Sequence, residues 1–561
     1  MNRLSRHIIK DQKTRDKHED PFSMMIFNRS DNECTHKNLK SENNSFMWFQ
    51  LLIEVLLNMG KHVEAKQELI EICRKQYEGN PIELTIIDQF QRSYENTKAI
   101  WWYTQESCIY RLLNKALRVQ DIDMLVVFRF LIKDLFVELT KEHQKFKHSQ
   151  NERSTRVFRG QLISTDEFTR IQASIGDFIS INSFFSASQS PERALEFART
   201  VPPSKDIQQI LFEIQIDVSL STKPFADVKH LSPFEDEKEF IFIVGSIFRI
   251  TQVAYDSKYS IWKIHLSLCN AHDRHLQDLL AFYKKEISQN STDAVSLSDL
   301  LFKMGEYNKA NQYYNQTLAE QSTCAQSRAN CYFGLGNVAI AQDKFSNALI
   351  CHTTALDLKK KFLANNHRDL ASSYNQIGVT YMKLENYQKA FDYVNQAFQI
   401  RQKCLHRNDR DLAESYRDIG LVQFRLRRND LALANHFEAH DIFTKILPKD
   451  HPDIAENLRY IAYVYGAIGE YNISLKHLKN ALKILKRSLP ENHADIGMIF
   501  EAMGHCLYAQ NNYISALDYF TRSLTIFRKS LPSTHESIQN VQQKIERTKA
   551  KLSQSPYRKK E

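Results

Sequence analysis

The second half of the chain repeats every 42 residues, and this period constrains the fold more than any other feature. Four columns of residues keep the spacing between about residue 326 and residue 533. One column holds histidines and an aspartate, one holds glycines and an alanine, and two hold alanines: His367, Asp409, His451, His493 and His535; Gly336, Gly378, Gly420, Ala462 and Gly504; Ala348, Ala390, Ala432 and Ala516; and Ala355, Ala397, Ala439 and Ala481. Columns that share one period predict a stacked array of structural repeats.

Each repeat has the pattern of two amphipathic helices, in which small residues allow the helices to approach closely. An aromatic residue is expected at the start of the second helix of a repeat. These aromatic residues are Phe345, Tyr387, Tyr471 and Tyr513. The stretch HPDIAENLRYIAYVYGAIGEYNISLKHLKNALKI at 451–484 is typical. It resembles the tetratricopeptide repeat, in the longer form found in kinesin light chains. The resemblance implies an all-α solenoid over 294–550, with a shorter first unit near 294–322, a capping helix over 534–550 and a flexible tail at 551–561.

A solenoid of helix pairs has a concave face that commonly docks a partner, so the resemblance implies peptide or protein ligands. Polar residues of the first helices, such as Asn375, Tyr416 and Asn457, either hold such a peptide or are simply solvated. The histidine column does not predict a metal array. Each histidine opens a turn before a helix, so the histidines lie one full repeat apart.

The first half of the chain has a different pattern. Residues 1–44 are polar and are predicted to be a disordered extension. Apolar residues then recur at helical spacing over 45–145, and strands follow over 150–270. In Ile207–Val218 the residues Phe212, Ile214 and Ile216 face one way, and Phe240–Ile250 and Tyr259–Leu268 are also read as strands. We therefore expect helices followed by an antiparallel-rich α+β sheet, with a connector at 273–293 before the repeats.

Three fragments of this first half carry chemistry, and they follow one another in the order VFRGQ (157–161), FFSAS (184–188) and EKEFIF (237–242). In an extended strand Glu237 and Glu239 face the same side. Paired carboxylates suit substitution at an anomeric carbon, because one supports an oxocarbenium-like transition state and the other manages a proton. The guanidinium of Arg159 suits bidentate contact with a diphosphate. Gly160 is expected to let a nucleotide approach the backbone.

Together the fragments resemble the arginine-specific mono-ADP-ribosyltransferases, whose active site is summarised as Arg, Ser, Glu. The resemblance implies catalytic roles for Arg159, Ser186, Glu237 and Glu239, and NAD binding by Arg159, Gly160, Ser186 and Glu239. NAD is implied as the co-substrate, with NADP possible and no metal.

The resemblance also assigns individual roles. Ser186 would brace the catalytic carboxylate, Glu239 would act on the NAD ribose, and Glu237 would act on the acceptor arginine. Phe234 would help select the acceptor protein, or it packs on its own domain. Ala187 departs from the family, which has threonine there, and this puts catalytic efficiency in doubt. Two residues of the helical lead-in that resembles the family, Tyr110 and Asn114, are expected to have packing roles.

The function implied is transfer of ADP-ribose from NAD to arginine side chains of proteins that the repeats recruit. Two alternatives stay open: a catalytically inactive adaptor, and an NAD glycohydrolase in which water replaces the acceptor. A labelled-NAD assay with agmatine, an arginine mimic, would separate the three.

Composition limits the remaining possibilities. The formal charge of 75 − 66 = +9 is mild for 561 residues and does not predict a nucleic-acid partner. The nine cysteines are scattered and have no CxxC spacing, which disfavours a disulfide scaffold or zinc site and favours a reducing compartment. Neither a signal peptide nor a membrane span is expected, so the predicted location is cytoplasmic.

Overall fold

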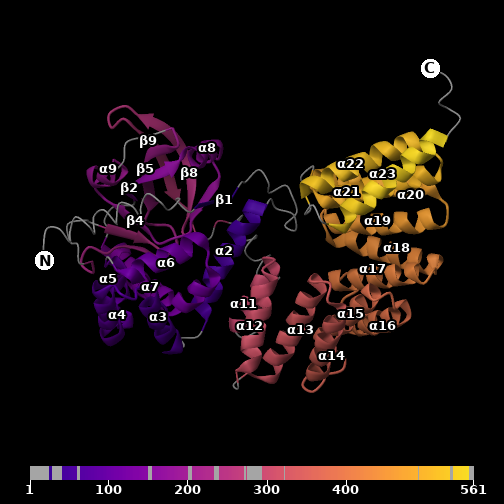
Figure 1. Ribbon diagram of the computed structural model, residues 1–561, viewed down its shortest axis with the longest axis horizontal. Helices are drawn as coiled ribbons and strands as arrows, with labels where there is room; N and C mark the ends of the chain where they lie inside the picture. The colour runs from indigo at the N-terminus through magenta and orange to yellow at the C-terminus, as the bar shows by residue number, and fades with distance from the viewer. Residues whose placement is uncertain are drawn as a thin grey trace. The chain divides into compact units, whose positions relative to one another are not determined.

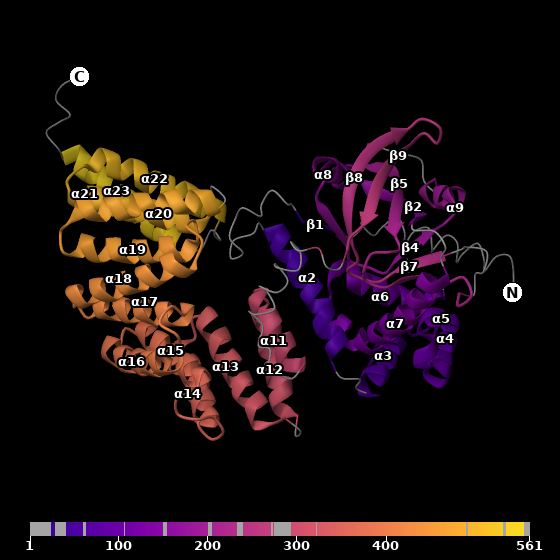
Figure 2. The ribbon, with the colours of Figure 1, turned by 180° about the vertical axis from the view of Figure 1, so that it is seen from behind.

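The computed structural model describes residues 24–27, 41–59, 63–105, 107–149, 154–199, 205–232, 239–270, 273, 293–320, 323–489, 492–530 and 535–554. The described residues form two compact units, the first ending at Leu300 and the second beginning at Leu301. Figures 1 and 2 show strands and helices in the first unit and successive helices in the second. None of the described helices is both long and apolar enough to cross a bilayer.

The first unit begins with helices, as the apolar spacing predicts. Helix α6 buries one stripe of residues: Ile109, Leu112, Leu113, Ala116 and Leu117. The hydroxyl of Ser107 accepts a hydrogen bond from the Tyr110 N–H and so caps the start of α6. The helix ends at Gln120, whose left-handed backbone (φ 54°) stops propagation. The bounds of the helices before the central strands are α2 Ser41–Asn58, α3 Val63–Gln76, α4 Pro81–Ser93, the 3₁₀ helix Asn96–Lys98, α5 Ala99–Thr104, α6 Cys108–Val119 and α7 Ile122–Ser149.

The described strands form one nine-stranded sheet in the order β1-β3-β8-β9-β5-β2-β4-β7-β6. Neighbouring strands are antiparallel except for the parallel pair β5 and β9. The side chains of Phe212, Ile214 and Ile216 are fully buried in the core of the sheet, as their alternation predicts. The strand bounds are β1 Met24–Phe27, β2 Ser154–Ser164, β3 Phe178–Ile181, β4 Phe185–Ser188, β5 Ile207–Asp217, β6 Phe225–Asp227, β7 Glu239–Phe242, β8 Ile247–Asp256 and β9 Ile261–Leu268.

The structure differs from the sequence-based expectation at two places in the sheet. The stretch 240–250 is not one strand, because a turn at Gly245 (φ +76°) separates β7 from β8. The expectation that residues 1–44 are disordered is wrong for Met24–Phe27, which pairs antiparallel with β3 and buries Ile26. Helix α2 also begins at Ser41. The other residues of this extension lie outside the described part of the chain.

Two short helices flank the sheet, one on each side in Figures 1 and 2. Helix α8 (Thr165–Ala173) starts with a capping box, in which Ser164 and Glu167 satisfy each other's backbone N–H groups. Helix α9 (Pro191–Ala198) is capped by Ser190 and packs on β2. Because α9 follows β4 directly, it lies close to the strands that carry the three chemical fragments.

The second unit is a stack of helix pairs, visible as successive layers in Figures 1 and 2. The second helices begin at Phe345, Tyr387, Tyr471 and Tyr513, as predicted. The final helix packs against α22, which agrees with the expected cap. Helix α11 (Asp293–Lys303) contains the boundary between Leu300 and Leu301. The bounds of the helices that follow it are α12 Tyr307–Ala319, α13 Ala325–Ala341, α14 Phe345–Lys359, α15 Arg368–Lys383, α16 Tyr387–Cys404, α17 Arg410–Arg425, α18 Asn429–Ile446, α19 Pro452–Ala467, α20 Tyr471–Ser488, α21 Ala494–Ala509, α22 Tyr513–Ser530 and α23 Glu536–Gln554. Of the expected connector, residues 274–292 lie outside the described residues, as do residues 555–561 of the expected tail.

The structure explains each column of the repeat. The histidine column caps the first helices: the side chains of His367, Asp409, His451 and His493 each accept the N–H two residues ahead. Aspartate replaces histidine because either side chain can accept this bond. The members of both alanine columns are fully buried, and the column glycines let a second-helix side chain lie directly on the first helix.

Candidate active site

The three chemical fragments lie on neighbouring strands, because β4 stands between β2 and β7 in the sheet. The register pairs Phe158 of β2 with Ser188 of β4, and Ser188 with Glu239 of β7. Phe158 and Glu239, which are 81 positions apart in the chain, therefore lie on either side of Ser188. The sheet topology brings the segments of Arg159, Ser186 and Glu239 together.

Three contacts fix Arg159, two of them with β4 and one with its own strand. Its Nη1 donates a hydrogen bond to the backbone oxygen of Ser186 at 2.7 Å, and its Nε donates to Oε1 of Gln161 at 3.2 Å. The guanidinium also lies 4.9 Å from the ring centre of Phe185, a cation–π distance. The Nη2 nitrogen makes no hydrogen bond with the described residues. It is the donor that remains for a ligand.

Neighbouring groups on three other elements, α5, α6 and β7, affect the pKa of Arg159. Burial lowers the pKa of Arg159, and nearby Tyr110, Tyr103 and Glu239 oppose this lowering. A guanidinium remains protonated at neutral pH even so, because its ordinary pKa lies far above neutral pH. The carboxylate of Glu239 is close enough to raise the pKa of Arg159, so an acidic group lies near the fixed cation.

The burial pattern of β4 shows what the departure from the family at Ala187 changes. Phe185 and Ala187 are buried in the sheet core, whereas Ser186 and Ser188 are partly exposed on the opposite side. The middle position of the motif therefore faces the core, so the replacement of threonine by alanine changes packing on the side away from both serines. The serine directly opposite Glu239 is Ser188.

Sequence reasoning missed Ser188 as a neighbour of Glu239. The Oγ of Ser188 accepts a hydrogen bond from the Ser190 N–H at 3.2 Å, at the start of α9. Directly opposed residues of an antiparallel pair place their side chains on one face. The Ser-x-Ser pattern at 186–188 was the available signal in the sequence. The register of β4 and β7 was needed to decide which of the two serines lies opposite Glu239.

Two tyrosines of the helical lead-in also lie at the site. The hydroxyl of Tyr103, on α5, donates to Oδ1 of Asn114 at 3.2 Å, and its ring centre lies 5.2 Å from that of Tyr110 and 4.9 Å from that of Phe184. Asn114 is buried, which agrees with its expected packing role. Tyr110 was expected to have a packing role. It is 37% exposed, and it opposes the lowering of the pKa of Arg159.

The structure gives Gly160 a packing function that the sequence did not suggest. A Cβ atom at this position would lie 1.8 Å from the backbone oxygen of Ala194 and 2.8 Å from the backbone nitrogen of Ala198. Helix α9 therefore fills the space into which a side chain at this position would project. The expected acceptor residues Phe234 and Glu237 lie outside the described residues.

In the repeats, the expected peptide-binding polar residues serve other purposes. Asn375 is 9% exposed and donates to Asp418 of the next repeat at 3.0 Å. Asn457 is fully buried and donates to the backbone oxygen of His436 at 2.8 Å. Tyr416 is partly buried, with its ring centre 4.8 Å from that of Phe398. These contacts join neighbouring helices, and Asn457 has no exposed surface to offer to a peptide or to solvent. Across the described ranges, no three His, Cys, Asp or Glu side chains form a group able to hold a metal ion.

Comparison with known proteins agrees with this division of the chain. Residues 61–273 match the sequence profile of the family described as NAD:arginine ADP-ribosyltransferase. A tetratricopeptide-repeat profile matches the overlapping segments 327–403, 369–445, 411–486 and 453–529. No curated protein sequence matches the chain significantly.

The solved structures similar to the chain include the following two. The kinesin-light-chain tetratricopeptide-like repeats from Podosopora anserina are 17% identical, with a TM-score of 0.33, and the match covers 37% of this chain and 97% of that chain. BtubC (BKLC) from P. vanneervenii is 14% identical, with a TM-score of 0.34, and the match covers 41% of this chain and 93% of that chain. From the two profile matches, the chain carries a domain of the NAD:arginine ADP-ribosyltransferase family, which uses NAD as its co-substrate, followed by a domain of tetratricopeptide repeats.

Proposed function

We propose that the first domain transfers ADP-ribose from NAD to arginine side chains of target proteins, and that the repeats recruit those targets. One observation carries the proposal most directly. Arg159 is fixed by the Ser186 carbonyl at 2.7 Å while the charge of Glu239 acts on it from the strand beyond. A cation for the diphosphate and a carboxylate for the ribose are thus held by one sheet.

Arg159 holds the NAD diphosphate in this proposal. Its Nη1 and Nε are oriented by Ser186 and Gln161, and Nη2 has no partner among the described residues. A guanidinium that is already oriented loses little side-chain entropy when it binds an anion. The residues present therefore fit a phosphate-bearing substrate.

Glu239 stabilises the positive charge that develops on the ribose as the bond to nicotinamide breaks. Its position at the start of β7, opposite Ser188 and two residue pairs along the ladder from Ser186, lets a serine hydroxyl orient the carboxylate. The electron pair of the broken bond leaves with nicotinamide, which departs as a neutral molecule.

Glu237 prepares the acceptor in this scheme, with Phe234 contributing to acceptor choice. The acceptor guanidinium is protonated at neutral pH, so it must lose a proton as its nitrogen bonds to C1 of the ribose. Glu237 precedes Glu239 by two positions, and residues at this spacing in an extended strand direct their side chains to one side.

Recruitment of targets by the repeats rests on the tetratricopeptide-repeat match, since arrays of this kind offer long docking surfaces. Arginine specificity rests on the family match together with the second carboxylate of the Glu-x-Glu segment.

The test is an assay of the full-length protein with labelled NAD and agmatine. The Glu239→Gln variant is expected to lose transfer by about 100- to 1,000-fold, the range for removal of one electrostatic catalytic group, while NAD binding measured by calorimetry is retained. Glu196→Gln, an exposed carboxylate of α9, is the control and should transfer normally. Normal transfer by Glu239→Gln would refute the assignment.

The products of the same assay distinguish the alternatives. The Glu237→Gln variant is expected to lose transfer to agmatine first and to keep hydrolysis of NAD. Equal loss of both activities would contradict the separate roles of the two carboxylates. Hydrolysis without any transfer in the unmodified protein would identify a glycohydrolase, and binding of NAD without turnover would identify an adaptor.

A further inference from the structure

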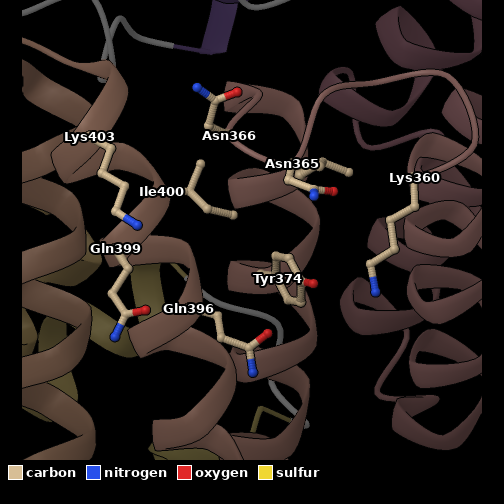
Figure 3. A pocket seen from close by; sticks show the side chains of 9 residues that line it. Lys360, Asn365, Asn366, Tyr374, Gln396, Gln399, Ile400 and Lys403 are labelled. Atoms are coloured by element: carbon tan, nitrogen blue, oxygen red, sulfur yellow. The ribbon is translucent and has the colours of Figure 1, made fainter.

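A pocket of about 430 Å³ lies in the helical part of the first unit. Its lining comes from α4, α5, α7 and the segment that follows β6, and it includes Trp101, Trp102 and a single acidic side chain, Glu138. The pocket in the repeats that Figure 3 shows is different, because it is lined by Lys360 and Lys403 and by no acidic side chain. That pocket has no group that would hold a cation, whereas the pocket of the first unit has one.

The carboxylate of Glu138 is buried, and no cationic side chain of the described residues forms an ion pair with it. Its Oε2 accepts a hydrogen bond from the Ile100 N–H at 2.8 Å, and the backbone of Ala99 also bonds to it. Burial raises the pKa of Glu138, the two backbone hydrogen bonds oppose the rise, the charge of Glu142 adds to it, and Lys141 opposes it. A carboxylate has about four acceptor positions, so about two remain for a ligand.

The two other ionisable side chains of the lining have acidic neighbours of their own. Lys98 forms an ion pair with Glu95 at 3.1 Å, and Nε2 of His230 lies 3.1 Å from a carboxylate oxygen of Glu142. Both Lys98 and His230 are exposed. The pocket therefore keeps one uncompensated carboxylate, that of Glu138.

The two tryptophans supply surfaces that suit a planar cation. Their ring centres lie 5.0 Å apart with 87° between the ring planes, and Trp101 is partly exposed whereas Trp102 is fully buried. The indole Nε1–H of Trp102 has no hydrogen-bond acceptor among the described residues. A tryptophan face attracts a guanidinium, and a buried donor without a partner favours a ligand that brings an acceptor.

Two connections join the pocket to the candidate active site. On α5, the residue after the tryptophan pair is Tyr103, which opposes the lowering of the pKa of Arg159. On the opposite side, Leu231 of the lining donates its N–H to the Val228 oxygen at 2.8 Å, and Val228 donates its N–H to the Glu239 oxygen at 2.9 Å. An acceptor segment whose arginine reaches Glu239 would therefore place neighbouring residues close to the pocket.

We propose that this pocket binds a second arginine of the acceptor protein, close in sequence to the arginine that is modified. The guanidinium lies on Trp101 and donates to Glu138, and a backbone oxygen of the same segment accepts from Trp102. Lysine fits less well, because an ammonium cannot stack on a ring or donate two parallel hydrogen bonds to a carboxylate. The inference rests on the proposed transfer to arginine, and it narrows the acceptors to segments that carry paired arginines.

The test uses the full-length protein, NAD and a series of peptides in which zero to four glycines separate two arginines. Each residue of an extended chain spans about 3.5 Å, so the series reaches separations of about 17 Å. For at least one spacing, kcat/KM is expected to be about 10-fold higher than for either peptide with one arginine replaced by glutamine, mainly through a lower KM. A gain that only doubled would reflect the second acceptor position and would count against the pocket.

Three variants locate the effect. Glu138→Gln keeps an oxygen for the Ile100 N–H but removes the charge, so it should remove most of the about 10-fold gain. Trp101→Leu should lower the gain about 3-fold, and it tests the pocket independently if Glu138→Gln does not fold. The matched control is Glu95→Gln, which removes a nearby exposed carboxylate that does not line the pocket, and it should keep the full gain. Circular dichroism checks the fold of each variant.

Absence of a gain at every spacing would overturn the proposal. So would a full gain in folded Glu138→Gln and Trp101→Leu proteins, or an equal loss in Glu95→Gln. Fluorescence anisotropy of the labelled peptide series without NAD measures binding apart from turnover. If agmatine is not modified but a two-arginine peptide binds and loses about 10-fold in affinity in Glu138→Gln, the pocket is supported and the proposed transfer has failed.

Discussion

At the scale of single residues, Arg159 shows why the cation of this site must be an arginine. Two of its nitrogens are used to fix the side chain, through Ser186 and Gln161, and the third stays available. Its flat guanidinium also lies over the ring of Phe185. A lysine has one ammonium, which cannot be anchored along two directions and also reach a diphosphate.

The Arg159→Lys variant is therefore expected to fold normally and to bind NAD poorly. We expect kcat/KM for nicotinamide release to fall about 10- to 100-fold, which corresponds to roughly 1.4–2.7 kcal/mol of lost interaction, and mainly through a higher KM. Initial rates over a range of NAD concentrations measure this. An unchanged KM would mean that Arg159 does not contact the substrate.

At the scale of elements, the packing of α9 on β2 depends on the absence of a side chain at Gly160. The backbone oxygen of Ala194 occupies the place where a Cβ atom would stand. Backbone atoms cannot rotate away as a flexible side chain can, so the whole helix would have to move. Because α9 follows the serine strand directly, this movement would also disturb Ser186 and Ser188.

The Gly160→Ala variant is expected to destabilise the first domain by about 3 kcal/mol, the upper part of the range for overpacking. A thermal unfolding scan measures the shift in Tm. Phe197→Ala, which removes a 44% exposed side chain from the same helix, should change Tm little. A Gly160→Ala protein with the original Tm would show that α9 can shift freely.

Two glycines inside repeat helices are expected to respond in opposite directions to alanine. A Cβ at Gly504 would lie 2.7 Å from ring carbons of Phe520, whereas a Cβ at Gly466 would meet its nearest atom, Oγ of Ser474, at 3.6 Å. Gly504→Ala should therefore cost about 1–3 kcal/mol. Gly466→Ala should stabilise by about 0.5–1 kcal/mol, because alanine loses less conformational entropy in a helix. Chemical denaturation of the two variants in parallel tests the sign of each effect.

At the scale of the whole molecule, two buried histidines make the repeat domain sensitive to acid. Burial lowers the pKa of His352 to about 4 and that of His436 to about 4. Nearby Lys359 adds to the lowering at His352, whereas the Asn457 hydrogen bond opposes it at His436. Both rings lie on a column glycine, Gly336 and Gly420. Protonation would place a charge in a site built for a neutral ring.

The folded pKa of each histidine is below its unfolded value of about 6.5, so below that pH the unfolded chain binds more protons. The stability of the repeat domain is complete above pH 6.5 and falls as the pH drops toward 4, by roughly 3 kcal/mol per histidine. Calorimetry between pH 7 and pH 4 measures the decline. His352→Leu should reduce it, since neither ring nitrogen of His352 has a partner in the described structure, and Leu478 occupies the same column.

If the stability of the His352→Leu protein falls with pH as steeply as that of the original protein, the decline does not come from His352. Other groups titrate in this range, so the comparison between the two proteins carries the test, rather than the decline itself. His352→Leu is also expected to be no less stable at pH 7, because it removes buried polar atoms that make no hydrogen bonds.

The sequence by itself determined the features that depend on near neighbours. The 42-residue columns predicted the helix pairs and their second-helix starts, because caps, small residues and apolar stripes act within one or two turns. The alternation of Ile207–Val218 predicted a strand for the same reason. The order of the three chemical fragments, together with the known family pattern, was enough to indicate NAD-dependent ADP-ribosyl transfer.

Only the tertiary structure decided which distant residues meet. Four contacts join distant parts of the chain whose local sequence does not predict the partner. They are the pairing of Met24–Phe27 with β3, the position of Ser188 opposite Glu239, the contact of α9 with Gly160 and the hydrogen bond from Asn375 to Asp418. Helix and strand propensities act over a few residues, whereas strand register and helix packing are set by the burial of surfaces that come from separate segments.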